Sequence, residues 1–128
     1  MQVIQLDHLV LTVNDIEVAI GFYQSVLGMK AITFAEGRVA LEFGEQKINL
    51  HQYGEEFEPK AQLPTPGSAD LCFLIDTPLK IAIAHVQQLG IVIEEGPVER
   101  NGACGPILSF YIRDPDHNLL EISKRISK

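Results

Sequence analysis

Imidazole and carboxylate side chains that could bind a metal ion or transfer a proton recur at matching places in this 128-residue sequence. His8 and Asp70 each stand in the first of a series of apolar-alternating segments, Glu121 stands in the last one, and His51 ends an earlier one. Histidine nitrogen and carboxylate oxygen are ligands of divalent metals, and a carboxylate can also act as a general base. These groups can act together only if the fold brings them to one surface, so the elements that carry them come next.

The first half of the chain predicts one strand, one helix and three further strands. Residues 4–13, IQLDHLVLTV, alternate between apolar and polar side chains as a half-buried strand requires. Asn14 with Glu17 three positions later resembles a capping box, and the apolar spacing that follows predicts a helix over residues 15–27 that stops at Gly28. Three more alternating segments are expected at residues 30–35, 38–43 and 47–51.

The second half repeats this order after a proline-rich connector. The stretch FEPKAQLPTPGS holds three prolines and a glycine and predicts an irregular boundary. DLCFLIDTP then begins with a strand, Thr77 and Pro78 predict a helix cap and first turn, and a glycine ends the helix. The offsets from His8 to Asp70 and from Gly28 to Gly90 are both 62 (70 − 8 and 90 − 28), as an internal duplication predicts.

Three strands complete the second half, with GPVERNGACG between the first two as a long loop and RDPDHN as a tight turn; they are expected near residues 91–94, 107–112 and 118–123. Eight strands with two helices define the α+β class. We expect one domain over residues 1–128, made of two tandem βαβββ modules at approximately residues 1–56 and 68–128. Each module alone would leave a sheet face uncovered, so the two modules are expected to pair and create a shared concave surface.

Strand parity sorts the side chains onto two faces. If the apolar side of every strand packs under its helix, side chains of the opposite parity face away from the helix. That second face would hold the polar and titratable groups: His8, Thr12, Arg38, Glu42, Asn49, His51, Asp70, Cys72, Ser109, Tyr111, Glu121 and Ser123. A solvated sheet face would be polar as well. The placement of His8, Asp70 and Glu121 at similar levels of first and last strands favours a site.

The composition argues against several classes of partner. The chain carries 17 acidic and 10 basic residues, a formal charge of −7, whereas proteins that bind nucleic acids or anionic membranes need a basic surface. No apolar run approaches the roughly 18 residues of a membrane span, and no leader pattern opens the sequence. Cys72 and Cys104 form no CxxC or Cys/His cluster, so reduced thiols are expected. These features predict a cytoplasmic protein that binds neither nucleic acid nor membrane.

Two stretches resemble the signatures of a known family. DHLVLTVNDIEVAIGFYQSVLGMK near the start and FYIRDPDHNLLEIS near the end are similar to those of the vicinal oxygen chelate proteins, the superfamily of glyoxalases, bleomycin resistance proteins and extradiol dioxygenases. The resemblance covers essentially the whole chain and implies a glyoxalase-type half-open barrel. The middle segment, INLHQYGEEFEPKAQLPTPGSADLCF, resembles a subgroup of small glyoxalase-domain proteins, some of them labelled as virulence-associated.

The resemblance implies one divalent metal ion per site, which would be Ni, Zn, Mn, Co or Fe. His8 matches the family's first-strand histidine, and Glu121 matches its last-strand glutamate. Asp70 stands where many relatives have a second histidine, and Asn49 stands where bacterial glyoxalase I has a glutamate, so two of four positions depart from that enzyme. Asp70 can still ligate through oxygen, and His51, which shares the parity of Asn49, can supply a nitrogen.

The implied activity is that of a lactoylglutathione lyase, a metal-dependent isomerisation. Glu121 or Glu42 would remove the proton from a hemithioacetal carbon and return it to the neighbouring carbon. The side chains expected to bind a small anionic substrate, such as a glutathione adduct, are Asn49, Arg38, Tyr111 and Arg100.

Two other classes of function stay open. A fosfomycin-type thiol transferase would need a cluster of cations for a phosphonate, and an extradiol dioxygenase would need two histidines and a glutamate around Fe(II). A metal-free module that binds a small ligand would explain Asn49 and Asp70 as a lost metal site. In family members of this size a second chain completes the site, which predicts a homodimer in which His8 of one subunit meets Glu121 of the other.

Overall fold

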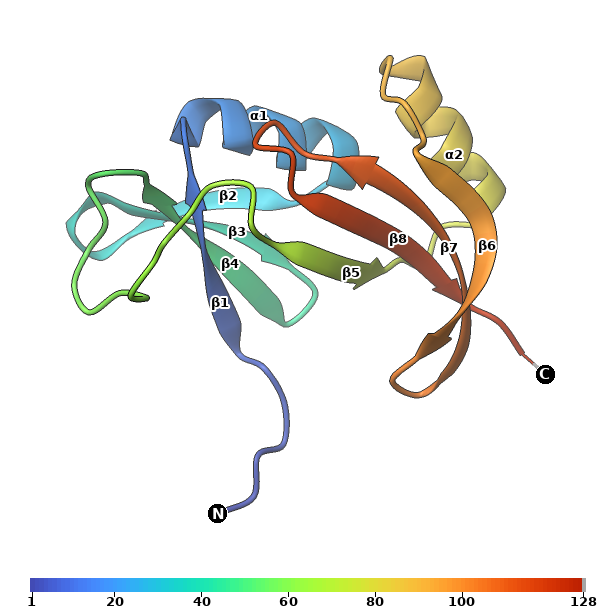
Figure 1. The fold of residues 1–128 in the computed structure, drawn as a ribbon, viewed down its shortest axis with the longest axis horizontal. Helices are drawn as coiled ribbons and strands as arrows, with labels where there is room; N and C mark the ends of the chain where they lie inside the picture. Colours follow the sequence, from blue (N-terminus) through green and yellow to red (C-terminus); the bar gives the residue numbers. More distant parts are fainter. Residues whose placement is uncertain (128) are drawn as a thin grey trace. The chain divides into compact units, whose positions relative to one another are not determined.

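The computed structural model describes residues 1–127, and its two units divide between Gly67 and Ser68, at the end of the predicted connector. Each unit is one βαβββ module with its own four-stranded sheet (Figure 1). Neither sheet closes on itself, because each one has two edge strands. The α+β class and the two repeated modules predicted from the sequence are confirmed.

The first module has the sheet order β1-β4-β3-β2, with the first strand parallel to the last and the other pairs antiparallel. Its elements are β1 (His8–Val13), α1 (Ile16–Leu27), β2 (Lys30–Phe34), a 3-10 turn (Ala35–Gly37), β3 (Arg38–Phe43) and β4 (Gln46–Gln52). Parallel strands cannot be joined by a tight hairpin, so the connection from β1 to β4 passes through α1, which lies over one face of the sheet (Figure 1).

The second module repeats this topology with the order β5-β8-β7-β6, in which β5 is parallel to β8. Its elements are β5 (Asp70–Leu74), α2 (Leu79–Gln88), β6 (Glu95–Gly102), β7 (Gly105–Arg113) and β8 (Leu119–Arg125). The repeat in the sequence therefore corresponds to a repeat of strand order and direction.

The N-terminal elements begin later than their sequence pattern predicts. Helix α1 is capped by Asp15, whose carboxylate accepts hydrogen bonds from the backbone N–H groups of Glu17 (3.0 Å) and Val18 (3.3 Å), so the predicted Asn14 capping box is wrong. Strand β1 begins at His8 although alternation starts at residue 4, because no strand pairs with residues 4–7 in the described part of the chain. Gly28, with φ of 66°, ends α1 as predicted.

The predicted strand at residues 91–94 and the predicted loop after it are wrong. Glu95–Gly102 forms β6, which pairs with β7 through a hairpin, and the register shifts between Glu95 and Val98. The shift marks a bulge at Gly96 and Pro97, residues that break apolar alternation and so hid the strand from sequence analysis.

The start of α2 also differs from expectation. The helix begins at Leu79, and the residue before it, Pro78, makes no side-chain capping hydrogen bond. Thr77 therefore does not cap the helix, and Pro78 lies just outside the first turn instead of within it. The helix packs through Leu79 and Val86, its two buried side chains.

Apolar side chains on the helix side of each sheet form the two cores. In the first module these include Val13, Leu41, Ile48 and Leu50, and in the second Phe110, Ile112, Leu120 and Ile122. All of them are at most 2% exposed, as the strand parity predicts, which leaves the opposite parity for the polar face. No helix in the described residues is long and apolar enough to cross a membrane.

A buried polar turn fixes β8 against β5 and β7. The carboxylate of Asp114, 4% exposed, accepts hydrogen bonds from the backbone N–H groups of Asp116 and Asn118 at 2.9 Å and from the Asn118 side chain at 2.8 Å. The Asn118 amide oxygen in turn accepts from the backbone N–H of Ala69 at 2.8 Å. The turn therefore sets the start of both β5 and β8, on which Asp70 and Glu121 lie.

The bulge in β6 makes Gly96 sensitive to substitution. Its φ is +110°, and an added Cβ would lie 2.5 Å from the Ser109 carbonyl oxygen. We expect Gly96→Ala to lower the free energy of unfolding by about 3 kcal/mol or more, because backbone strain and a backbone clash add. Gly37→Ala, at φ +75° with nothing within 4 Å, is the control and should lose only about 1 kcal/mol. Urea unfolding measures both, and equal losses would contradict the packing described.

Candidate functional site

The strand registers place a defined set of side chains on the polar face of the first module. His8 is opposite Lys47, which is opposite Glu42 on the next strand, and Asn49 lies between Val10 and Ala40 in the same way. His51 is opposite Thr12 at the end of β4. Cross-strand partners share a face, so these residues, with Arg38 and Phe34, form what we call the first-module face: Phe34, Arg38, Glu42, Lys47, Asn49, His51 and His8.

The imidazole of His8 is oriented by its neighbour in sequence. Its Nδ1 lies 2.8 Å from Oδ2 of Asp7, and both side chains are exposed. Donation from Nδ1 to the carboxylate leaves Nε2 with its lone pair available, which is the arrangement by which carboxylates commonly orient metal-binding histidines. Sequence parity did not identify Asp7, because it lies on the opposite face of an ideal strand and before the start of β1.

Asn49 holds a buried acceptor without a donor. Its Oδ1 is buried and has no hydrogen-bond partner, and no other side-chain atom in the described residues shares that condition. Leaving such an acceptor unsatisfied costs about 1–3 kcal/mol. A natural structure keeps this cost only where something else is gained, so Asn49 points to a ligand that carries a donor or to a cation.

His51 is covered by an aromatic ring. It is 8% exposed and meets Phe57 edge to face, with ring centroids 5.7 Å apart, while the Arg38 guanidinium lies 4.3 Å from the same ring centroid. Burial lowers the pKa of His51, the Arg38 charge lowers it further, and Glu56 opposes them. The imidazole is thus neutral near pH 7, as a metal ligand must be, but Phe57 packs against it.

The second module presents its own polar face. The registers align Cys72, Glu121, Tyr111 and Glu95 across the four strands, and they align Ser123 with Ser109 in the next row. Cys72 is the cross-strand partner of Glu121, just as Val10 is the cross-strand partner of Asn49. Glu121 therefore occupies the same topological position in this module as Asn49 does in the first.

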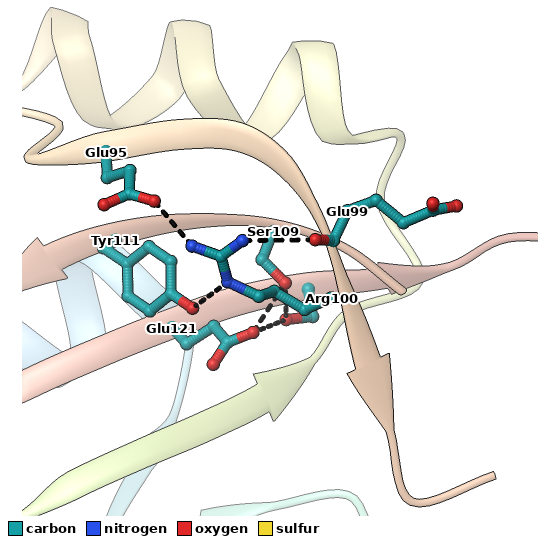
Figure 2. Close-up of polar contacts among 7 residues, drawn as sticks. Glu95, Glu99, Arg100, Ser109, Tyr111 and Glu121 are labelled. Carbon is teal, nitrogen blue, oxygen red and sulfur yellow. Dashed lines mark hydrogen bonds and ion pairs between the residues drawn. The ribbon is translucent and has the colours of Figure 1, made fainter. Parts of the chain in front are cut away.

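Two fully buried serines hold the Glu121 carboxylate. The hydroxyl of Ser109 donates to Oε2 of Glu121 at 2.7 Å and lies 2.7 Å from the hydroxyl of Ser123, which itself lies 3.5 Å from Oε2 (Figure 2). Cys72 completes the chain, with its sulfur 3.2 Å from the Ser123 hydroxyl. Only Oε2 is engaged in these contacts, so Oε1 remains available for a cation or a proton.

Tyr111 and Arg100, both expected to bind substrate, are brought together. Nε of Arg100 donates to the Tyr111 hydroxyl at 3.0 Å, and Nη2 pairs with Glu95 at 2.5 Å (Figure 2). These partners raise the pKa of Arg100, with the Tyr111 hydrogen bond as the largest cause. Because Glu95 already neutralises it, Arg100 is a weaker anion site than the sequence alone implied.

The two remaining candidate carboxylates are exposed. Asp70 begins β5 on the face that carries Glu121, and Glu42 lies on the first-module face opposite Lys47. No group of three or more His, Cys, Asp or Glu side chains close enough to hold a metal ion occurs within residues 1–127. The structure gathers Glu121 with the serines and Arg100 with Tyr111, while His8, His51, Asp70 and Glu42 do not join either cluster.

Comparison with known proteins defines the class to which the fold and these faces belong. The Glyoxalase/Bleomycin resistance protein/Dioxygenase superfamily matches residues 5–122, and the chain belongs to this superfamily. The resemblance inferred from the two signature stretches is thereby confirmed.

Particular relatives are similar over nearly the whole chain. Virulence protein STM3117 from Salmonella typhimurium is 61% identical over 122 residues, covering 95% of this chain and 85% of that protein. Glyoxalase domain-containing protein RDO1 from Mycosarcoma maydis is 58% identical over 123 residues, covering 96% of this chain and 69% of that protein. The structure of an integron cassette protein from the mobile metagenome of V. cholerae matches with a TM-score of 0.97 at 61% identity and 98% coverage of both chains.

A more distant match supports the fold alone. A lactoylglutathione lyase from Agrobacterium tumefaciens has a TM-score of 0.71 at 23% identity, covering 94% of this chain and 92% of that chain. The glyoxalase-type fold is confirmed by this likeness, and at such identity it says nothing of the reaction.

The pKa of the Cys72 thiol depends on its neighbours in the cluster formed by Glu121, Ser109 and Ser123. Desolvation raises the pKa of Cys72, and the charges of Glu121 and Asp70 raise it further, against a lowering by the Ser123 hydrogen bond. We therefore expect Glu121→Gln to lower the pKa of Cys72 and to shift the pH profile of its alkylation rate to lower pH. The measurement uses a Cys104→Ser background. Glu99→Gln, a charge change on β6, should leave the profile in place, and an unmoved profile in both variants would contradict the cluster.

The pKa of His51 tests the contact with Arg38. Arg38→Met removes a nearby positive charge while keeping a stem against Phe57, so the pKa of His51 should rise toward its ordinary value. Folding is expected to lose stability as pH falls below about 6.5, because the unfolded chain then takes up the proton first. Imidazole chemical shifts followed through a pH titration measure the change. Arg125→Met serves as the control, and an equal pKa in all three proteins would disprove the contact.

Proposed function

We propose that the chain is a divalent-metal-dependent enzyme of the glyoxalase type, a lyase or isomerase that acts on a small oxygen-chelating substrate. One observation carries the proposal: the two candidate ligands that match the family pattern are each held by one atom and free at another. His8 is held at Nδ1 by Asp7 and Glu121 is held at Oε2 by Ser109, which leaves Nε2 and Oε1 available.

The donor chemistry of the two faces fits a divalent ion. His8 and Asn49 occupy the first-module face, and Asp70 and Glu121 occupy the equivalent rows of the second module. One imidazole and two carboxylates form an oxygen-rich set, which suits Mn, Fe or Zn. The set differs from the one expected for glyoxalase I at Asp70 and at Asn49, whose amide oxygen we assign to the substrate. We assign His8 and Glu121 as the main ligands, with Asp70 next. His51 ranks last because Phe57 packs against its ring.

A bound ion would polarise oxygens of the substrate and stabilise negative charge that develops on them. The chain's own groups would do the rest. Glu121, or Glu42 from the first module, would accept a proton from a carbon beside the chelating oxygens and deliver it to the neighbouring carbon. Ser109 and Ser123 would keep the Glu121 carboxylate in one orientation, which is the condition for proton transfer along a fixed path.

The proposal includes a homodimer whose sites are shared between subunits, so that His8 of one chain meets Glu121 of its partner. The substrate would be anionic, such as a glutathione adduct, held by Arg38 and by the Tyr111 and Arg100 pair.

Metal binding by the purified full chain tests the proposal. Chelator-stripped protein is titrated with Ni, Zn, Co, Mn and Fe(II), and we expect one ion per chain. His8→Ala and Glu121→Gln should each weaken binding by more than about a hundredfold, because even groups that only orient a ligand contribute about 10- to 100-fold. Asp7→Asn should weaken it by about tenfold. His85→Ala, on α2, should bind as the unsubstituted chain does.

Turnover separates the reactions. Conversion of the methylglyoxal and glutathione hemithioacetal with any of these metals would support the lyase, and its absence with all of them would exclude that substrate. Thiol transfer to fosfomycin and cleavage of a catechol ring with Fe(II) are assayed in parallel, since both are reactions of the superfamily.

A metal-free module that binds a small ligand is the second candidate. It is favoured by Asn49, a neutral amide in the row where Glu121 stands in the other module. Under this reading the stripped chain binds no ion tightly, and the His8→Ala and Glu121→Gln variants bind metals as weakly as the unsubstituted chain does.

A further inference from the structure

Two half-buried cations on the first-module face have no acidic partner. Elsewhere Arg100 pairs with Glu95 and Arg113 pairs with Glu94, as expected in a chain with 17 acidic and 10 basic residues. The side chains of Arg38 and Lys47 make no ion pair or hydrogen bond with any described residue and lie over aromatic rings instead, Arg38 over Phe57 at 4.3 Å and Lys47 over Phe34 at 4.1 Å. Their N–H donors therefore remain unused.

The side chain of Lys47 extends away from its nearest acid. Glu42 lies directly opposite Lys47 in the register, yet Nζ of Lys47 is over Phe34, a residue whose cross-strand partner is Arg38. Ala40, which lies between Arg38 and Glu42 on β3, is fully buried. Neither positive charge forms an ion pair with a carboxylate of the described residues, an arrangement that an anion would stabilise.

The orphan acceptor of Asn49 lies on the same face. Asn49 follows Lys47 by two positions on β4 and pairs with Ala40 on β3. Arg38 precedes Ala40 by two positions, so Arg38, Lys47 and Asn49 are close neighbours on this face. Its Oδ1 requires a donor. An ammonium donor would be repelled by Lys47 and Arg38, whereas a hydroxyl group would not, so the combination selects an anion that also carries a hydroxyl.

We propose that Arg38, Lys47 and Asn49 form a subsite for a small hydroxycarboxylate group, with the two cations binding the carboxylate and the Asn49 amide oxygen accepting from the hydroxyl. The subsite rests on the proposed function, since it names the part of the substrate that the first module would hold. Arg38 and Lys47 have long side chains, and their rotation away from the aromatic rings would open a path to the buried oxygen without movement of the strands.

The test uses metal-free, isotope-labelled full chain and lactate as the probe, at constant ionic strength, so that chelation of a metal plays no part. Lactate should shift the backbone amide signals of residues 38–40 and 47–51. Propionate, which lacks the hydroxyl, should bind about three- to tenfold more weakly, and lactamide, which lacks the charge, should cause no shift. Arg38→Met and Lys47→Met should each weaken lactate binding about tenfold, and Asn49→Ala should abolish the preference for lactate over propionate.

Lys80→Met is the matched control, because it removes one charge from the exposed surface of α2, and it should bind lactate normally. Thermal unfolding shows that each variant is folded; if Arg38→Met is not, Lys47→Met carries the test. Lactate that shifts none of these amides, or that binds both charge variants as it binds the unsubstituted chain, overturns the subsite. Tight metal binding without lactate binding would refute the subsite alone, and lactate binding without tight metal binding would refute the proposed metal site alone.

Discussion

Each module depends on the parallel pairing of its first strand with its last. β1 is hydrogen-bonded to β4 and β5 to β8, and in both cases a helix forms part of the crossover that a parallel pair requires. This pairing brings the two ends of a module into one register. Residues far apart in sequence, such as Val10 and Asn49 (49 − 10 = 39 positions) or Cys72 and Glu121 (121 − 72 = 49 positions), thereby become neighbours on the same face. A shift of one residue in either pair would turn the polar face into the core.

The orientation of each candidate ligand depends on the residues that form hydrogen bonds with it. Glu121 has a defined orientation because buried hydroxyl groups occupy one of its oxygens, and the Asp114 turn fixes the strand on which it lies. Among the described residues, the exposed Asp7 alone orients the His8 imidazole. The two candidate ligands therefore differ in rigidity: Glu121 is held by a buried network, whereas His8 stands near the end of a chain segment that has no strand partner in the described residues.

Parity and glycine positions predicted most of the architecture. Alternation assigned most strands, Gly28 and Gly90 marked the helix ends, and the residues of the polar face followed from counting in twos. Strand β6 was not predicted, because Gly96 and Pro97 form a bulge that is stabilised by pairing with β7, and the local sequence does not reveal that contact. The direction of side chains could not be predicted from the sequence either. The contact of Lys47 with the Phe34 ring depends on the twist of the sheet and on the neighbouring side chains.

The hydroxyl groups of Ser109 and Ser123 resembled an ordinary polar surface in sequence, and their complete burial in the structure distinguishes them. Ser109 and Ser123 were placed on the polar face by parity without any assigned role, because a hydrogen bond depends on rotamers that spacing cannot supply. In contrast, Glu121 was identified from its motif, which is a property of the sequence itself.

The equivalence of Asn49 and Glu121 has a consequence for how such a chain can change. An internal duplication provides the same scaffold position twice, and each copy can accept a different functional group while the strand pairing around it is preserved. In this chain one copy carries a carboxylate and the other an amide flanked by cations. Divergence between halves of a single gene can therefore alter selectivity with no new fold and with no insertion.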